Sequence, residues 1–213
     1  MGKFIVFEGG EGSGKSTQAR SLFRKLGRRG ILALLTHEPG GTDVGQRIRR
    51  LVKGAGDINP MSELLLFAAS RGQLVAEVVR PALKKGEVVI SDRYADSTRA
   101  YQGYGRGLHM ATIDAINDMA TGGLNPDLII LLDMVAEGGL ARKGPASSDR
   151  FEREEAGFHR RVREGYLKLA RADPGRWLVV DATLPRRKVA EAIWERVSKI
   201  IAEEAPHEAL AQA

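Results

Sequence analysis

The sequence predicts an α/β fold in which a five-stranded parallel sheet lies between two layers of helices. Two observations lead to this prediction: five short apolar runs of strand length, and helical periodicity in the stretches between them. The runs lack the alternation of a strand with one wet face, which indicates strands that are buried on both faces. Helices are then needed on both sides of the sheet. The five runs are Phe4–Phe7, Ile31–Leu35, Glu87–Ile90, Leu128–Leu132 and Trp177–Val180.

The first helix is predicted directly after the first apolar run. Ala19, Leu22, Phe23 and Leu26 recur at the spacing of one helix face, and Gly27 ends the pattern. Further helices are expected at 44–52, 61–79, 109–120, 151–172 and 187–204.

The stretch 61–79 is apolar on nearly every side. A single core-facing stripe cannot use all of these side chains, so we expect this helix to contact the sheet, a ligand and a second subunit. A helix that lies deep within one domain is the alternative.

Length and composition favour one domain, 1–213, with one excursion. The chain has 213 residues, of which 43% are hydrophobic, enough for a substantial core. Val135–Ser148 is rich in Gly, Ala, Pro and Ser, which predicts a flap, or lid region, over about 135–152. The absence of cysteine excludes disulfides and thiolate zinc sites. No apolar stretch approaches 18 residues, so we expect a cytoplasmic protein without a membrane partner.

The net charge of +6 suggests anionic partners without separating nucleotides from nucleic acids. The basic residues are scattered among acids, and no basic stripe interleaved with aromatic residues is present. We therefore expect no nucleic-acid partner, and a DNA-binding ATPase stays as an alternative.

The segment Gly9–Ser16 matches the pattern G-x-x-x-x-G-K-[ST] between the first predicted strand and helix. Its glycines let backbone N–H groups surround an anion, and the following helix N-terminus adds partial positive charge. Lys15 can reach the β- and γ-phosphates of a nucleotide, and the hydroxyl of Ser16 can bind Mg²⁺. The pattern predicts a nucleoside triphosphate site with Mg²⁺, although many ATPases and GTPases share this loop.

A second group of charged residues is expected at the same edge of the sheet. Asp92 and Arg93 follow a predicted strand at its carboxyl end, where α/β sheets bind ligands. The carboxylate of Asp92 can hold Mg²⁺ through water, and Arg93 can bind phosphate as a planar fork. Arg49 is a further candidate cation, and Arg142 and Lys143 lie in the predicted flap. No serine–histidine pair or general base stands out, which fits a phosphate group as the acceptor.

Five separated segments resemble bacterial-type thymidylate kinases, which use ATP and Mg²⁺ to phosphorylate dTMP. The segments are FEGGEGSGKST at 7–17, EPGGT at 38–42, the FxxxR of Phe67 and Arg71, DRYADSTRAYQG at 92–103 and DRFE at 149–152. In order and spacing, the resemblance extends over about residues 4 to 183. The resemblance implies the P-loop nucleoside monophosphate kinase fold, a three-layer sandwich with a lid, and a homodimer.

The resemblance also implies roles for individual residues. Phe67 and Arg71 are one helical turn apart, so a ring can stack on thymine while the guanidinium binds its carbonyl edge. A core phenylalanine with a surface arginine is the alternative for this pair. Glu11 matches the acid near the sugar 3′-hydroxyl and the metal, and Tyr101 matches the ring that crowds the 2′ position. The implied dTMP-binding residues are Glu11, Pro39, Arg49, Phe67, Arg71, Arg93, Ser97, Tyr101 and Gln102.

The implied ATP-binding residues are Gly9, Gly10, Glu11, Gly12, Ser13, Gly14, Lys15, Ser16, Thr17 and Arg142, and the implied metal ligands are Ser16 and Asp92. The expected catalytic residues are Lys15, Arg49, Asp92, Arg93 and Arg142. Because the loop has Gly12 where one branch of the family has an arginine, the lid is expected to supply the transition-state cation. Arg142 is the best match, with Lys143 and Arg150 as alternatives. A kinase for dUMP or for a deoxynucleoside remains a second possible function.

Overall fold

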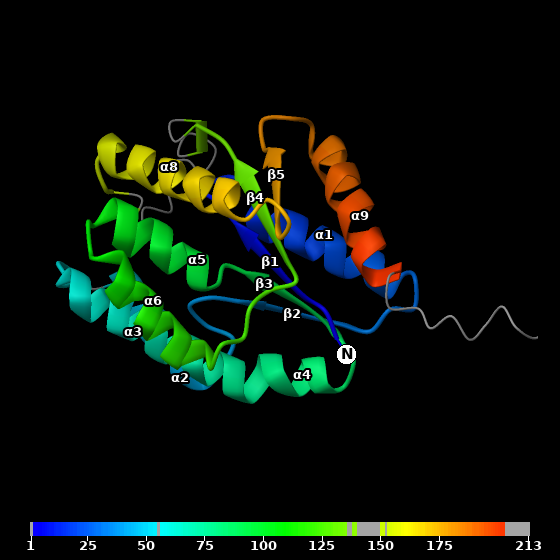
Figure 1. Ribbon diagram of the computed structural model, residues 1–213, viewed down its shortest axis with the longest axis horizontal. Coiled ribbons are helices and arrows are strands. Elements are labelled where there is room, and N and C mark those ends of the chain that lie inside the picture. Colours follow the sequence, from blue (N-terminus) through cyan, green and yellow to red (C-terminus); the bar gives the residue numbers. More distant parts are fainter. Residues whose placement is uncertain (1, 55, 136–137, 140–149, 152, 203–213) are drawn as a thin grey trace, which may run out of the picture.

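The computed structural model describes residues 2–54, 56–135, 138–139, 150–151 and 153–202. Most of the predicted lid, with Arg142 and Lys143, lies outside the described residues. The sheet consists of β1 (Phe4–Glu8), β2 (Ala33–His37), β3 (Val88–Asp92), β4 (Leu128–Asp133) and β5 (Trp177–Asp181) in the order β2-β3-β1-β4-β5 (Figure 1). Every pairing is parallel. The predicted five-stranded parallel sheet is therefore confirmed.

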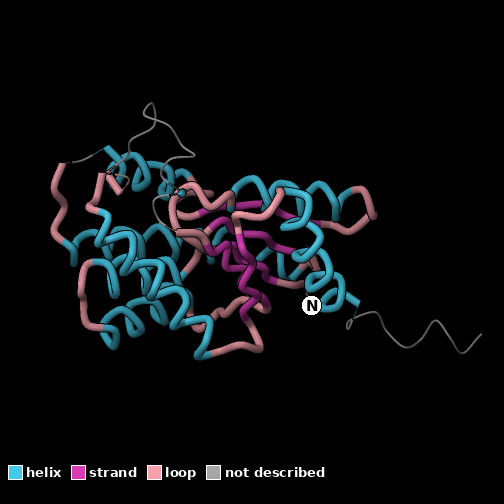
Figure 2. The backbone as a smooth tube through the Cα atoms, turned by 90° about the horizontal axis from the view of Figure 1, so that it is seen from above, coloured by secondary structure: helices cyan, strands magenta, loops and turns pink. Residues whose placement is uncertain are grey.

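Helices cover both faces of this sheet, and the strands are seen between them in Figure 2. The described helices are α1 (Lys15–Gly27), α2 (Asp43–Gly54), α3 (Pro60–Leu74), α4 (Arg80–Lys84), α5 (Ala95–Thr98), α6 (Met110–Thr121), α8 (Ala156–Ala172) and α9 (Arg186–Ala202). Two π-helical segments, η1 (Val75–Val79) and η2 (Arg99–Gly105), continue α3 and α5. The three-layer architecture matches the predicted α/β class.

The central strand β1 is buried on both sides, as the missing alternation predicts. Ile5 and Phe7 belong to a core with side chains of α1 and α9. Phe4 and Val6 belong to a second core, with side chains of α3, η1 and α4. A third cluster joins β4 to α8 and η2. The four apolar residues of β1, Phe4–Phe7, are buried, so a polar substitution on either face would leave an unsatisfied group in a core.

The apolar stretch 61–79 forms α3 and the π-helical segment η1 rather than a single α-helix, and α4 continues it. The side chain of Asn59 caps its start by accepting a hydrogen bond from the N–H of Met61, and Pro60 follows at the first helical position. Val75 and Val79 pack against β1 through the second core. The predicted contact between this stretch and the sheet is therefore confirmed.

Two elements begin two or more residues later than predicted. The helix expected from residue 151 begins at Ala156, because the buried ring of Phe151 packs against Phe67 and Tyr101, with 5.9 Å between ring centroids in each case. The strand expected from Ile31 begins at Ala33, since the N–H of Ile31 donates to Leu26 in the turn after α1.

The helical segments α5 and η2 were not predicted, because 95–105 has no apolar periodicity. This stretch is held instead by its contacts with α8 and by polar side chains beneath it.

Candidate active site

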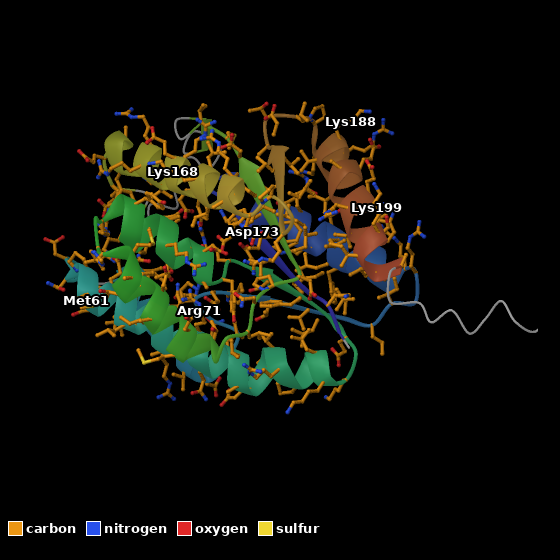
Figure 3. The ribbon with its side chains drawn as sticks, viewed as in Figure 1. Met61, Arg71, Lys168, Asp173, Lys188 and Lys199 are labelled. Atoms are coloured by element: carbon orange, nitrogen blue, oxygen red, sulfur yellow. The ribbon has the colours of Figure 1, made fainter. Side chains whose placement is uncertain are left out.

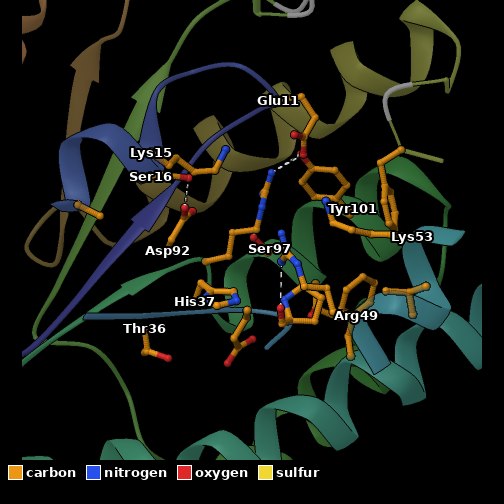
Figure 4. Close-up of a pocket in the computed structure, with 18 of the residues that line it drawn as sticks. Glu11, Lys15, Ser16, Thr36, His37, Arg49, Lys53, Asp92, Ser97 and Tyr101 are labelled. Atoms are coloured by element: carbon orange, nitrogen blue, oxygen red, sulfur yellow. Dashed lines mark hydrogen bonds and ion pairs between the residues drawn. The ribbon is translucent and has the colours of Figure 1, made fainter. Parts of the chain in front are cut away.

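A cavity of about 630 Å³ lies at the carboxyl ends of β1, β2 and β3 (Figure 4). Its lining comes from the loop after β1, the end of β2, helices α2 and α3, the end of β3, and the segment α5–η2. Parallel α/β sheets bind their ligands at this edge. The fold therefore brings segments far apart in sequence to one site.

The loop between β1 and α1 needs its glycines. Gly9, Gly12 and Gly14 have φ angles of 141°, 68° and 93°, which other residues rarely adopt. A Cβ atom at Gly12 would also lie 1.9 Å from the carbonyl oxygen of Gly139. A turn of this kind in front of a helix N-terminus forms a cradle for an anion.

Lys15 is enclosed by this loop. Its Nζ donates hydrogen bonds to the carbonyl oxygens of Gly9, at 3.0 Å, and Gly10, at 2.7 Å. Burial, followed by the charge of Arg93, lowers the pKa of Lys15 to about 8. An anion bound beside Nζ would favour the charged form and oppose this shift.

Ser16 and Asp92 meet at the edge of the cavity. The hydroxyl of Ser16 donates to the carboxylate of Asp92, so a residue of α1 contacts a residue of β3. Hydroxyl and carboxylate oxygens are ligands that Mg²⁺ accepts, and this ion usually takes only one or two carboxylates, together with waters and substrate phosphates. The described residues contain no cluster of three or more His, Cys, Asp or Glu that could hold a metal ion. The pair therefore fits Mg²⁺ held jointly with a nucleotide, as the sequence predicts.

Arg93 lies between the phosphate loop and α5–η2, and it has a positive φ of 76°. Its Nη2 contacts the carboxylate of Glu11 at 2.5 Å and the hydroxyl of Tyr101 at 3.0 Å. Its Nη1 donates to the hydroxyl of Ser97 at 3.2 Å. Burial opposes the charge of Arg93, but Tyr101 and Glu11 outweigh it and raise the pKa of the guanidinium. A fixed, permanently charged fork therefore faces the middle of the cavity.

A buried carboxylate, Glu8, is linked to Arg93 through the hydroxyl groups of Ser97 and Tyr166, which bond to both residues. Its two oxygens accept hydrogen bonds from the N–H groups of Tyr94 and Ser97 and from the hydroxyls of Ser97 and Tyr166. Burial raises the pKa of Glu8 to about 7, and the charge of Arg93 opposes that rise. Glu8 thus connects β1 to the start of α5 and to α8.

Phe67 and Arg71 line the cavity from α3, one helical turn apart. Arg71 is only 1% exposed, so the alternative of a surface arginine is wrong. Figure 3 shows Arg71 inside the molecule and Met61 at the outer end of the same helix.

Almost all N–H donors of the Arg71 guanidinium group are hydrogen-bonded. Four of its hydrogen bonds go to the carboxylate of Glu38 at 2.9 Å, the side-chain oxygen of Asn117 at 2.6 Å, the carbonyl of Tyr94 at 3.1 Å and the hydroxyl of Thr98 at 2.9 Å. A guanidinium has five N–H donors, so among the described residues one N–H on Nη1 has no partner. That donor is available to a ligand in the cavity.

Arg49 reaches the cavity from α2. Its Nη1 donates to the carbonyl oxygen of Pro39 at 3.0 Å, and both residues belong to the lining (Figure 4). Arg49 is therefore another cation in the lining that contains Arg93.

Most of the predicted site residues meet in this cavity. Those that line it are Glu11, Gly12, Gly14, Lys15, Ser16, Thr17, Pro39, Arg49, Phe67, Arg71, Asp92, Arg93, Ser97, Tyr101 and Gln102. Gly9, Gly10 and Ser13 shape the loop around Lys15 instead. Arg150 lies apart from the lining, where its Nη2 donates to Glu63. Arg142 lies outside the described residues.

Sequence reasoning missed Glu8, Glu63 and Tyr166. Glu63 is a fully buried acid within a stretch predicted to be apolar, and Glu8 is a fully buried acid directly after the predicted apolar run Phe4–Phe7. A charged residue at such a position signals a buried polar network. Tyr166 carries no such signal, because its ring packs in the core while only its hydroxyl reaches Glu8.

No helix among the described residues is long and apolar enough to cross a membrane.

Comparisons with known proteins agree on one family. Residues 7–193 match the family described as thymidylate kinase. A thymidylate kinase of Dehalococcoides mccartyi strain 195 is 51% identical over 203 residues, which cover 94% of this chain and 98% of that protein. One from Deinococcus radiodurans is 50% identical over 203 residues, covering 93% and 98%. The crystal structure of thymidylate kinase from Ehrlichia chaffeensis superposes with a TM-score of 0.76 at 32% identity, covering 92% of this chain and 98% of that one.

Proposed function

Since the chain belongs to the thymidylate kinase family, we propose that its cavity binds ATP and dTMP together and transfers the γ-phosphoryl group of ATP to dTMP, giving dTDP and ADP. The supporting observation is that one cavity is lined by a phosphate loop, by an aromatic–guanidinium pair and by Arg93, which contacts Glu11 of the loop.

The loop Gly9–Thr17 is the proposed donor site. Backbone N–H groups and the N-terminus of α1 would bind the phosphates of ATP, and Lys15 would contact the β- and γ-phosphates. In the structure Nζ of Lys15 is held by loop carbonyl oxygens, which places the ammonium group at the cradle before a nucleotide binds.

Ser16 and Asp92 would hold Mg²⁺, the hydroxyl directly and the carboxylate through water. When bound, the ion would neutralise negative charge on the phosphates of the donor. The presence of both oxygens at one edge of the cavity supports this role, and dependence on added Mg²⁺ tests it.

The middle of the cavity is the proposed acceptor phosphate site. Arg93 and Arg49 would bind the phosphate of dTMP, and Glu11 would approach the sugar 3′-hydroxyl and the metal. Arg93 is supported by Glu11, Ser97 and Tyr101, so little ordering is needed when the phosphate arrives. The ring of Tyr101 would crowd the 2′ position and favour deoxyribose.

Phe67 and Arg71 are the proposed base site. The ring of Phe67 would stack on thymine, while the unpartnered Nη1–H of Arg71 would donate to a carbonyl oxygen of the base. Because the other donors of Arg71 are bonded, its guanidinium cannot move away to suit a different ligand.

The chemistry requires positioning and charge stabilisation rather than a general base. A phosphate monoester dianion is already a nucleophile near neutral pH. The cations at the two phosphate sites would bring donor and acceptor into line and stabilise the charge that develops. We propose that the lid, about 135–152, closes over them and supplies Arg142.

A coupled assay with the purified protein, ATP, Mg²⁺ and a panel of nucleoside monophosphates tests this function. dTMP should have the highest kcat/KM, and Phe67→Ala should lower it by about tenfold through lost stacking. A preference for dUMP or for a deoxynucleoside would favour the second kinase assignment. DNA-stimulated ATP hydrolysis without formation of dTDP would favour an ATPase and reject the proposal.

We also propose a homodimer through α2, α3 and α6, which lie side by side (Figure 1). These helices leave large apolar side chains exposed, namely Val44, Leu51, Met61, Leu65 and Met119. Exposed apolar side chains on neighbouring helices are typical of protein interfaces. Light scattering after size exclusion should give twice the chain mass, and Leu65→Glu should reduce the measured mass to that of the monomer.

A cytoplasmic location stays a prediction.

A further inference from the structure

Glu63 is a fully buried carboxylate on α3, one helical turn before Phe67. Its Oε1 accepts a hydrogen bond from Nε2 of Gln102 at 2.6 Å and one from Nε of Arg106 at 3.3 Å. Its Oε2 accepts from Nη2 of Arg106 at 3.3 Å and from Nη2 of Arg150. Two segments distant in sequence from α3, one with Gln102 and Arg106 and one with Arg150, therefore converge on this acid.

The charges around Glu63 determine whether its side chain donates or accepts hydrogen bonds. Two guanidinium groups contact its oxygens, and adjacent positive charge favours the ionised form of an acid. An ionised carboxylate only accepts hydrogen bonds. The side-chain amide of Gln102 must therefore turn its NH₂ group, rather than its oxygen, toward Glu63.

Fixing one end of this amide also fixes the other. Gln102 is 1% exposed and lines the cavity, and its Oε1 has no hydrogen bond to any described residue. Because Nε2 is bonded to Glu63, Oε1 is the acceptor left for a ligand. Arg71 lines the same cavity with its one unpartnered Nη1–H, and it bonds to Thr98, one helical turn before Gln102. This part of the cavity thus offers one donor and one acceptor to a base.

On the basis of the proposed function, we propose that Glu63 is a positioning residue for base selectivity. By holding Nε2 of Gln102, it leaves Oε1 toward the base, so that the site takes a pyrimidine with a proton on N3 and rejects one with a lone pair there.

The two classes of pyrimidine differ at just these atoms. Thymine and uracil carry N3–H and a 4-oxo group, which complement the oxygen of Gln102 and the N–H of Arg71. Cytosine carries a lone pair on N3 and a 4-amino group, so an acceptor would meet an acceptor and a donor would meet a donor. Buried polar groups left unpaired in this way give strong discrimination.

Glu63→Gln tests this role because it leaves the shape of the side chain nearly unchanged. The new amide would turn its oxygen toward Arg106 and Arg150 and its NH₂ group toward Gln102. Gln102 would then reverse and present its own NH₂ group to the base. We expect the ratio of kcat/KM for dTMP over dCMP to fall by at least about tenfold, with a measurable gain for dCMP. The ratio for dTMP over dUMP should stay within about twofold, because both bases carry N3–H.

Glu154→Gln is the matched control. Oε1 of Glu154 lies 2.6 Å from Nη2 of Arg106, so this variant removes a carboxylate from the same arginine without a contact to Gln102. Both ratios should equal those of the wild type. Turnover of dTMP by the wild type tests the proposed function separately, since its absence would reject the kinase assignment before any ratio is measured.

A purely structural role for Glu63 predicts that Glu63→Gln lowers kcat/KM for dTMP, dUMP and dCMP in parallel, and that result would overturn the proposal. If Glu63→Gln does not fold, Gln102→Ala decides the matter, because it removes the oxygen itself. A fall in the dTMP over dCMP ratio in Gln102→Ala is expected. An unchanged ratio in that variant would show that this amide does not read the base, and would equally overturn the proposal.

Discussion

The guanidinium of Arg93 lies 2.5 Å from the carboxylate of Glu11, and this contact joins the loop after β1 to the end of β3. Both side chains line the cavity, and Tyr101 bonds to each of them at 3.0 Å. The proposed donor and acceptor sites thus share one network of charges. A substitution of Arg93 or Glu11 should therefore lower kcat/KM for the acceptor more than it lowers the stability of the fold.

Replacing Arg93 by lysine keeps the charge but removes the planar fork. Lysine cannot reproduce simultaneous contacts with a phosphate, Ser97 and Glu11. We expect kcat/KM for dTMP to fall by about 10²-fold, with KM for ATP changing by less than about threefold, as measured by steady-state kinetics. Arg99→Lys is the control, because Arg99 pairs with Asp96 and Asp114 away from the cavity. Wild-type kinetics in Arg93→Lys would show that Arg93 does not bind the acceptor.

Replacing Tyr101 by alanine should relax the preference for deoxyribose. The ring that crowds the proposed 2′ position is then lost, so kcat/KM for ribothymidine monophosphate should rise by about tenfold relative to dTMP. Tyr101→Phe keeps the ring and loses only the hydroxyl bonded to Arg93 and Glu11. It should lower turnover of both nucleotides while leaving their ratio unchanged. An unchanged ratio in Tyr101→Ala would place the sugar elsewhere.

The buried carboxyl of Glu8 makes stability depend on pH. Burial raises its pKa from 4.5 to about 7, so the folded protein binds a proton between these values that the unfolded chain does not. The stability that comes from this proton is fully present below about pH 4.5 and is lost as pH rises through about 7. Because four hydrogen-bond donors favour the ionised form, we expect the change to be about 1–3 kcal/mol.

Thermal unfolding from pH 5 to pH 8 measures this effect, with Glu8→Gln as the reference. The variant cannot titrate at this position. The Tm of the wild type should therefore fall relative to the Tm of Glu8→Gln as pH rises. Taking this difference cancels the contributions of other groups, such as Glu38, whose pKa is also raised by burial. A constant difference across the range would show that Glu8 does not titrate there.

Replacing Arg142 by alanine should lower kcat by about 10²-fold or more, within the range for arginines that stabilise phosphoryl transfer. Binding of both substrates should change little, since the proposed contact forms in the transition state. Single-turnover rates with saturating ATP and dTMP measure this effect. Lys143→Ala is the comparison, and a larger loss in that variant would make Lys143 the main lid cation.

The phosphate loop could be predicted completely because all its groups are consecutive in sequence. Its glycines and Lys15 act through a local backbone conformation that needs only a preceding strand and a following helix. Asp92 and Arg93 could be predicted for a related reason. In a parallel sheet the carboxyl ends of the strands share one edge, so a polar pair directly after a strand must lie there.

The roles of Glu8 and Glu63 could not be predicted, because their partners come from other parts of the chain. Glu63 meets Gln102, Arg106 and Arg150 through the packing of α3 against η2 and the segment before α8. The segment α5–η2 was missed for a similar reason. Its helical form depends on polar contacts to Glu8 and on packing with α8 rather than on a pattern of its own.

By itself, therefore, the sequence determined the class of fold, the phosphate loop and the edge of the sheet at which the proposed second anion site lies, since these follow from local backbone preferences and the period of apolar residues. Only the tertiary structure decided that Arg71 is buried and nearly saturated, that Glu8 supports Arg93, and that Glu63 orients Gln102. Hydrogen bonds depend on distance and direction between particular atoms, and spacing along the chain does not specify either for residues brought together by folding.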